Sequence, residues 1–201
     1  MARSKKGKDA SDARGRVLNA AERLYALKGY DGVRLRDIAS EAGIDHSSIY
    51  FHAPGGKESL YVEVMVRLLE RHRDALSRIV AESEGDLLAQ LRGYARWIAS
   101  NPPVDTLRMR HVDYAHLDRK HVRKLGPLSG SAFLDPIETA LRAAHARDEI
   151  REVDFRLAAG GLYSMLLMVH AIPAGSTDKS HEQVSRELVD IFLHGLMNAS
   201  A

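Results

Sequence analysis

Five side chains near the N-terminus can do chemistry that the packing of a small helical unit does not use. They are His46, Ser47, Ser48, Phe51 and His52. Imidazole and hydroxyl groups form hydrogen bonds with the edges of bases, and a helix that presents such groups fits the major groove of DNA. This stretch therefore predicts a recognition helix; the alternative is a helical hairpin with a polar outer face.

Two crossed helices must position these side chains, and residues 35–49 have small and apolar residues where such a pair needs them. Ala39 permits close crossing, and Gly43 can adopt the positive φ of the tight turn. Asp45 is predicted to cap the second helix. The wedge between the helices is expected to contain Ile38, Ile44 and Ile49. The spacing predicts a helix-turn-helix over residues 33–53.

Around this motif, apolar residues recur with the period of about 3.6 residues that is typical of α-helices. No run of alternating β-branched residues bounded by turns is found, so the fold is predicted to be all-α. A first helix is predicted to end at Gly29, and Gly126 with Pro127 is predicted to interrupt the chain. Later helices are expected over residues 57–81, 87–98, 107–117, 134–144, 154–172 and 178–198.

Positive charge is concentrated at the start of the chain. Residues 1–60 hold 11 lysines and arginines against 8 aspartates and glutamates, whereas the whole chain has a formal net charge of only +2. Arg3, Lys5, Lys6 and Lys8 precede every periodic segment, which predicts an unstructured basic arm able to contact phosphates. A solvated terminus or a cloning remnant explains the same residues equally well.

Composition excludes several other classes of protein. The chain of 201 residues has no cysteine, which excludes disulfides, thiolate metal sites and cysteine nucleophiles and fits a reducing cytoplasm. The N-terminal segment lacks the apolar centre of a signal peptide, so it is expected to be retained, and secretion is not expected. The most apolar run, residues 157–172, is too short for a membrane span and is predicted to be a buried helix.

The helix-turn-helix and its flanks resemble the N-terminal signature of the tetracycline-repressor (TetR) family over about residues 14–65. The resemblance implies a three-helix DNA-binding domain with a basic arm at residues 1–56. It also implies a larger helical domain for regulation, ligand binding and dimerisation at residues 57–201. The matching segments are residues 20–30 (AAERLYALKGY), 35–39 (LRDIA), 43–44 (GI), 49–50 (IY) and 54–60 (PGGKESL).

The same resemblance assigns roles around the recognition helix. Tyr50 and Lys57 would contact DNA phosphates, Lys57 from the start of a helix whose dipole favours an anion. Val33 stands where the family commonly has a threonine cap, and Ala53 where it commonly has an aromatic residue. Arg34 can replace the lost phosphate contact with a charged one.

In the family, the last two helices form the dimer interface. The sequence fits, because residues 184–196 carry an apolar stripe and residues 158–161 are small enough for a partner helix to approach. The residues predicted to dimerise are Gly160, Gly161, Leu188, Phe192 and Leu196. An ordinary core within one chain is the alternative.

The family also encloses a ligand cavity among the remaining helices. Aromatic and soft side chains line such apolar pockets, although helical spacing makes core packing the alternative for each of them. The candidates are Tyr94, Trp97, Met109, His111, Tyr114, Phe133, Tyr163 and Met165. His111 and His116 are five residues apart, which does not align them for a shared metal, and no metal or cofactor is predicted.

These features predict a transcriptional regulator, with repression as the family's usual mode and a small-molecule effector that releases it from DNA. Its expected partners are an inverted-repeat operator in double-stranded DNA, the effector and a second copy of the chain, and no membrane. A DNA-binding adaptor controlled by a protein partner is the main alternative. An enzyme is not expected, because no G-x-S-x-G elbow or phosphate-binding loop is present and the H-E-x-x-H pattern that begins at His181 fails at Ser185.

Overall fold

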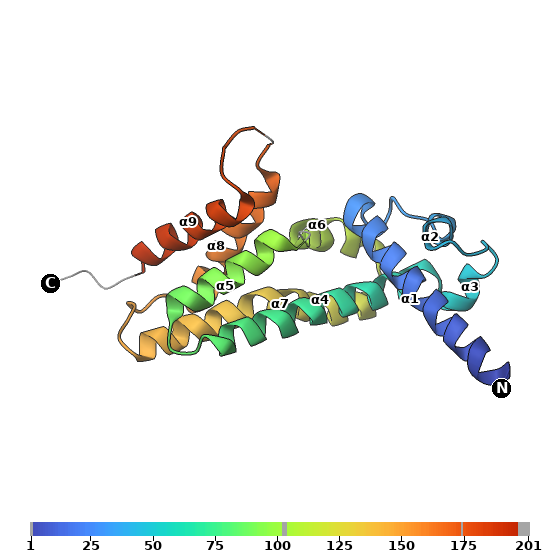
Figure 1. Cartoon of the computed structure of the whole chain (residues 1–201), viewed down its shortest axis with the longest axis horizontal. Coiled ribbons are helices and arrows are strands. Elements are labelled where there is room, and N and C mark those ends of the chain that lie inside the picture. Colours follow the sequence, from blue (N-terminus) through green and yellow to red (C-terminus); the bar gives the residue numbers. More distant parts are fainter. Residues whose placement is uncertain (1, 102–103, 174, 197–201) are drawn as a thin grey trace. The chain divides into compact units, whose positions relative to one another are not determined.

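The computed structural model describes residues 2–101, 104–173 and 175–196, with side chains from residue 12 onward except that of residue 107. The described ranges contain helices and no strand, which confirms the all-α prediction (Figure 1). In chain order the elements are α1 (Ala2–Lys28), α2 (Leu35–Ala42), α3 (Ile49–His52), α4 (Gly56–Glu82), α5 (Leu87–Ser100), α6 (Thr106–His111), η1 (Asp113–His116), α7 (Arg119–Ala146), α8 (Phe155–Leu167), η2 (Met168–Ala171) and α9 (His181–His194).

The chain packs as two compact units. The first unit comprises Met1–Leu69 and Val104–Leu128, and the second comprises Glu70–Pro103 and Ser129–Ala201. Helices α4 and α7 therefore each contribute to both units. The expected functional boundary at residue 56 does not coincide with this division, because the start of α4 and the segment with α6 and η1 pack with the N-terminal helices.

The core of the first unit forms where the apolar stripes of α1, α2 and α4 meet. Tyr25 of α1 packs edge-on against Tyr61 of α4, with ring centroids 4.9 Å apart, and Tyr30 packs on the same ring at 5.0 Å. Gly29 adopts a φ of 70°, which ends α1 as predicted. The other buried apolar side chains of this core include Val17, Ala20, Ala21, Ile38, Ala39, Ile49, Leu60 and Val64.

The core of the second unit is built from the remaining helices, with α9 packed against α5 and α8. Capping side chains fix where three of these helices begin. Asp86 accepts the N–H of Ala89 at the start of α5, and Asp154 accepts that of Leu157 at the start of α8. Ser180 caps α9, which ends at His194, and the expected extension to Asn198 lies outside the described residues.

Three sequence predictions about elements are wrong. Helix α7 runs without interruption through Gly126 and Pro127. The backbone is helical from Ala2, so the basic N-terminal residues belong to α1 and not to an unstructured arm, because alanine, lysine and arginine favour helix. The helix predicted to be buried over residues 157–172 exposes Leu157 and Met168. Among the described residues, no helix combines the length and apolar character needed to cross a membrane.

Candidate nucleic-acid interface

The turn between α2 and α3 closes as the sequence predicts. Gly43 has φ 64° and ψ 41°, a left-handed conformation that glycine adopts without steric cost. Its N–H donates to the Ser40 carbonyl at 3.2 Å, and the Ile44 N–H donates to the Ala39 carbonyl at 3.0 Å. These bonds satisfy the free carbonyls at the end of α2. The wedge contains Ile38 and Ile49, both buried, and the half-buried Ile44.

The start of α2 differs from the expectation. Val33 is fully buried and precedes the cap, which is Arg34. The carboxylate of Asp37 reaches back and accepts the Arg34 backbone N–H at 2.9 Å. This is the return bond of a capping box, and it satisfies the backbone N–H of the cap residue itself. The guanidinium of Arg34 remains exposed.

The recognition segment begins as a turn and only then becomes a helix. The Asp45 carboxylate accepts the Ser47 backbone N–H at 2.7 Å and the Ser47 hydroxyl at 2.5 Å. The hydrogen bond from the Ser47 side chain is the main reason that the pKa of Asp45 lies below its usual range. Short polar side chains that bind the local backbone compete with helix formation, and α3 accordingly starts at Ile49 instead of His46. The prediction that Asp45 caps this helix is therefore wrong, because its carboxylate holds the preceding turn.

The later helix start determines which side chains face solvent. Tyr50 and Phe51 are exposed, whereas His52 is only 8% exposed. His52 lies three residues after Ile49 and so shares its buried face. The expectation that His52 faces a groove is therefore wrong. The exposed polar residues of the preceding turn are His46, Ser47 and Ser48.

Two basic residues fix the approach to α4. Arg14 of α1 donates to the His52 carbonyl and pairs with Glu63 of α4, which ties α3 to both longer helices. The ammonium of Lys57 lies 4.2 Å from the centroid of the Tyr30 ring, within the range of a cation–π contact. Lys57 is thus held in the first turn of α4, where backbone N–H groups also favour an anion.

Comparison with known proteins agrees with this geometry. The model for bacterial regulatory proteins of the tetR family matches residues 17–64, which run from α1 to the first part of α4. The HTH-type transcriptional regulator LmrA of Bacillus subtilis (strain 168) is 41% identical over 66 residues, which are 33% of this chain and 35% of LmrA. The chain matches only about a third of the length of its curated relatives.

Solved structures share the fold over nearly the whole chain. A putative TetR-family transcriptional regulator from Mesorhizobium loti MAFF303099 is 25% identical, with a TM-score of 0.66 and coverage of 94% of this chain and 98% of the other. AibR in complex with isovaleryl coenzyme A and operator DNA is 21% identical, with a TM-score of 0.71 and coverage of 89% and 97%. Residues 17–64 of this chain belong to the tetR family of bacterial regulatory proteins, and nearly the whole chain has the fold of solved TetR-family regulators.

Four of the predicted ligand residues belong to one aromatic cluster in the second unit. The Tyr94 hydroxyl donates to the Phe133 carbonyl at 2.9 Å, and the Phe133 and Tyr163 rings stack with centroids 4.8 Å apart. Trp97 donates from Nε1 to Nδ1 of the buried His72 at 3.0 Å. Sequence reasoning missed His72, although a histidine on the apolar stripe of α4 was a signal for it.

The other predicted ligand residues lie apart from this cluster in the chain. Met109, His111 and Tyr114 belong to the first unit, where Met109 is buried and His111 is exposed. Met165 on α8 is half-buried. In the second unit, an open hollow of about 680 Å³ has Trp97 in its lining, together with Ile79, Leu88, Arg92 and Arg96. Trp97 is thus shared between the aromatic cluster and this hollow.

The residues that the family resemblance assigns to the dimer have mixed environments. Gly160 and Gly161 have open space where a Cβ would lie. Leu188 and Phe192 are half-buried. Leu196 is buried, and its carbonyl accepts the Arg151 N–H at 3.1 Å, so its side chain belongs to the interior of its own unit and not to an exposed interface.

Exposed apolar side chains on α8 and α9 extend this face. Leu157 is 73% exposed and Ile191 is 65% exposed. Gly161 lies four residues after Leu157 on the same face of α8, and Met168, the first residue of η2, is also exposed. Sequence reasoning placed Leu157 and Met168 in a buried helix and so missed them as surface residues.

Proposed function

We propose that this chain is a transcriptional regulator that binds an inverted-repeat operator in double-stranded DNA as a homodimer. The observation that carries the proposal is the set of exposed side chains in segment 46–51. The left-handed Gly43, the turn bonds of Asp45 and the buried isoleucines fix this segment on the surface of the first unit. A segment held by such packing presents its side chains in one geometry, which base recognition requires.

Base reading and phosphate anchoring fall to different side chains in this proposal. His46, Ser48 and Phe51 are exposed and reach base edges in the major groove. Tyr50 and Lys57 anchor the backbone phosphates. Arg34 and Ser47 add polar contacts at the rim. The Ser47 hydroxyl is engaged by Asp45, so its larger contribution is to the shape of the turn.

Dimer formation has independent support in the exposed apolar face of α8 and α9. Leu157, Gly161, Met168 and Ile191 would meet their own counterparts across a two-fold axis, since isologous dimers pair one patch with itself. A two-fold dimer presents two recognition segments to one face of DNA, with half-sites about 34–36 Å apart or a multiple of that distance.

We propose further that an apolar or aromatic small molecule acts on the second unit and releases the protein from its operator. Trp97 lines the hollow of this unit and supplies aromatic surface of the kind that such ligands contact. Tyr94, Phe133 and Tyr163 are buried, and we propose that they become ligand contacts when the helices around them open. AibR, a protein of the same fold, has been crystallised with isovaleryl coenzyme A and operator DNA. Release requires that the ligand bind the free protein more tightly than the DNA-bound protein.

The proposal is tested by selecting bound duplexes from a random library with the purified full-length protein. We expect enrichment of an inverted repeat and a complex with two chains per duplex. Enrichment without two-fold symmetry would contradict dimeric binding, and the absence of any enriched sequence would contradict sequence-specific recognition. A thermal-shift screen then identifies ligands, because a molecule that binds only the folded state raises the unfolding midpoint.

A further inference from the structure

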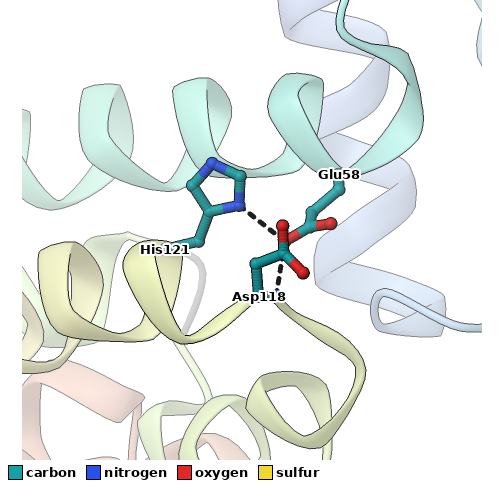
Figure 2. A group of neighbouring side chains, drawn as sticks. All are labelled: Glu58, Asp118 and His121. Atoms are coloured by element: carbon teal, nitrogen blue, oxygen red, sulfur yellow. Dashed lines mark hydrogen bonds and ion pairs between the residues drawn. The ribbon is translucent and has the colours of Figure 1, made fainter.

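A glutamate, an aspartate and a histidine from distant parts of the sequence converge in the first unit (Figure 2). Glu58 lies in the first turn of α4, Asp118 immediately precedes α7, and His121 lies in the first turn of α7. His121 Nδ1 is 2.5 Å from Glu58 Oε1, and the Asp118 backbone N–H donates to the same oxygen at 2.7 Å. One ligand atom from each residue lies within 4.8 Å of the other two.

The surroundings of the three side chains suit a cation that keeps contact with solvent. The side chains of His121 and Glu58 are 18% and 25% exposed, whereas that of Asp118 is 66% exposed. Glu58 and Asp118 bring negative charge to this place, and their charges add to burial, the largest cause, in raising the pKa of the neighbouring Tyr30 hydroxyl. The ammonium of Lys120, whose Nζ lies 3.8 Å from Asp118 Oδ2, partly offsets this negative charge.

We propose that Glu58, Asp118 and His121 bind one divalent transition-metal ion of the Zn²⁺ class. The ligands are His121 Nδ1 and one oxygen from each carboxylate, a combination of nitrogen and oxygen that Zn²⁺ accepts at about 2.0–2.2 Å. The ion takes the place of the hydrogen between His121 Nδ1 and Glu58 Oε1, and the neutral imidazole then carries its one proton on Nε2. Water occupies the fourth position beside the exposed Asp118.

Small movements are enough to form the site. Tetrahedral ligands at these bond lengths lie roughly 3.3 Å from one another. The contact between His121 and Glu58 therefore lengthens by less than about 1 Å, and Asp118, whose carboxylate is mostly exposed, swings inward. The imidazole sets the preference, because Mg²⁺ favours all-oxygen sites with several waters.

Two carboxylates at helix starts are also stable without any ion, since the helix dipoles favour negative charge there. Those dipoles oppose a bound cation, so we expect weaker binding than at a closed structural zinc site.

The bound ion would join the first turn of α4 to the first turn of α7. Binding is measured on the free protein and does not depend on the proposed DNA contact of the adjacent Lys57.

Equilibrium dialysis of the chelator-treated full-length protein against ZnSO4, followed by metal analysis, tests the proposal. We expect one ion per chain and a higher midpoint of thermal unfolding. Glu58→Gln and His121→Asn should each weaken binding at least about tenfold, the loss that even indirect partners of a metal site cause. Glu58→Gln keeps an acceptor for the Asp118 N–H, and circular dichroism checks the helix content of both variants.

The matched control is His181→Asn. His181 is exposed, and its ring lies 5.4 Å from that of His170, so the pair is a competing surface site for zinc. Its replacement should leave stoichiometry and affinity unchanged. The proposal is overturned if binding persists in both Glu58→Gln and His121→Asn, if His181→Asn abolishes it, or if equimolar Mg²⁺ displaces the Zn²⁺.

Discussion

The Tyr61 hydroxyl donates a 2.9 Å hydrogen bond to Oδ2 of Asp113, a residue that is only 3% exposed. Oδ1 of the same carboxylate accepts the Tyr30 backbone N–H at 3.0 Å. Burial, followed by the charge of Asp113, raises the pKa of Tyr61 far above its ordinary value, so the hydroxyl remains a donor. One buried carboxylate thus joins η1 to α4 and to the turn after α1.

Removing this carboxylate should be costly. In Asp113→Ala the Tyr30 N–H and the Tyr61 hydroxyl lose their partner while still buried, and each unsatisfied group costs about 1–3 kcal/mol. We expect the free energy of unfolding to fall by about 2–6 kcal/mol in urea titrations followed by circular dichroism. Asp31→Ala, at an exposed position, is the control, and an equal effect in both variants would contradict the role assigned to Asp113.

The proposed dimer face predicts that a charge on α8 or α9 yields monomers. Leu157→Asp and Ile191→Asp place a carboxylate on side chains that are exposed in one chain, so the fold should survive while the apolar contact between chains is lost. Sedimentation velocity should show monomers with wild-type helix content. Leu27→Asp, on an equally exposed leucine of α1, should stay dimeric. Dimers in both α8 and α9 variants would place the interface elsewhere.

Most helices were predictable because the apolar period is a local signal. The break predicted at Gly126 and Pro127 fails for a reason that is not local. Proline fixes a φ that is compatible with a helix, but it removes one backbone hydrogen bond. This cost is offset when packing anchors the helix on both sides of the proline. Leu125 before the pair and Ile137 after it are fully buried, so packing maintains α7 through this point.

The candidate site was predictable only in part. Gly43 and Ile38 were assigned correctly because their roles follow from the geometry of a tight turn. The burial of His52 was missed because it depends on where α3 begins, and each shift of one residue rotates the helix by about 100°. The contacts of Asp113 and His121 join positions about 50–90 residues apart, and no sequence period reports them.

Acid should remove the contribution of the Glu138 carboxylate, in the second unit, to the free energy of unfolding. Glu138 accepts hydrogen bonds from Arg142 at 2.7 Å and from Arg156 at 3.1 Å. The bond from Arg142 is the main cause that lowers the pKa of Glu138, with Arg156 adding to it against the effect of burial. The pKa of Glu138 in the folded protein lies below that in the unfolded chain. Its stabilisation of the fold is therefore complete above about pH 4.3 and is lost as pH falls through the pKa of the folded state.

Glu138→Gln should therefore lower the free energy of unfolding at pH 7 by less than about 1 kcal/mol, as expected for a partly exposed ion pair. The difference from the wild type should shrink at pH 3. Urea midpoints at pH 7, 5 and 3 measure this, with Glu152→Gln at an exposed position as the control. If the difference in urea midpoint between Glu138→Gln and the wild type grows on acidification, the pKa of Glu138 is not lowered in the folded protein.

The last prediction separates phosphate anchoring from base reading in the proposed interface. Lys57→Ala should weaken binding to all duplexes alike and reduce the slope of log affinity against log salt by about 0.9, because one fewer counterion is released. His46→Ala should keep the salt slope and relax the preference at particular base pairs, at a cost of about 1–3 kcal/mol on the selected site. Lys28→Ala, at an exposed lysine of α1, should change neither quantity. Lys57 also contacts the Tyr30 ring, so circular dichroism must first show that the variant folds. If Lys57→Ala alters base preference while His46→Ala leaves it intact, the assignment of the recognition segment to residues 46–51 is wrong.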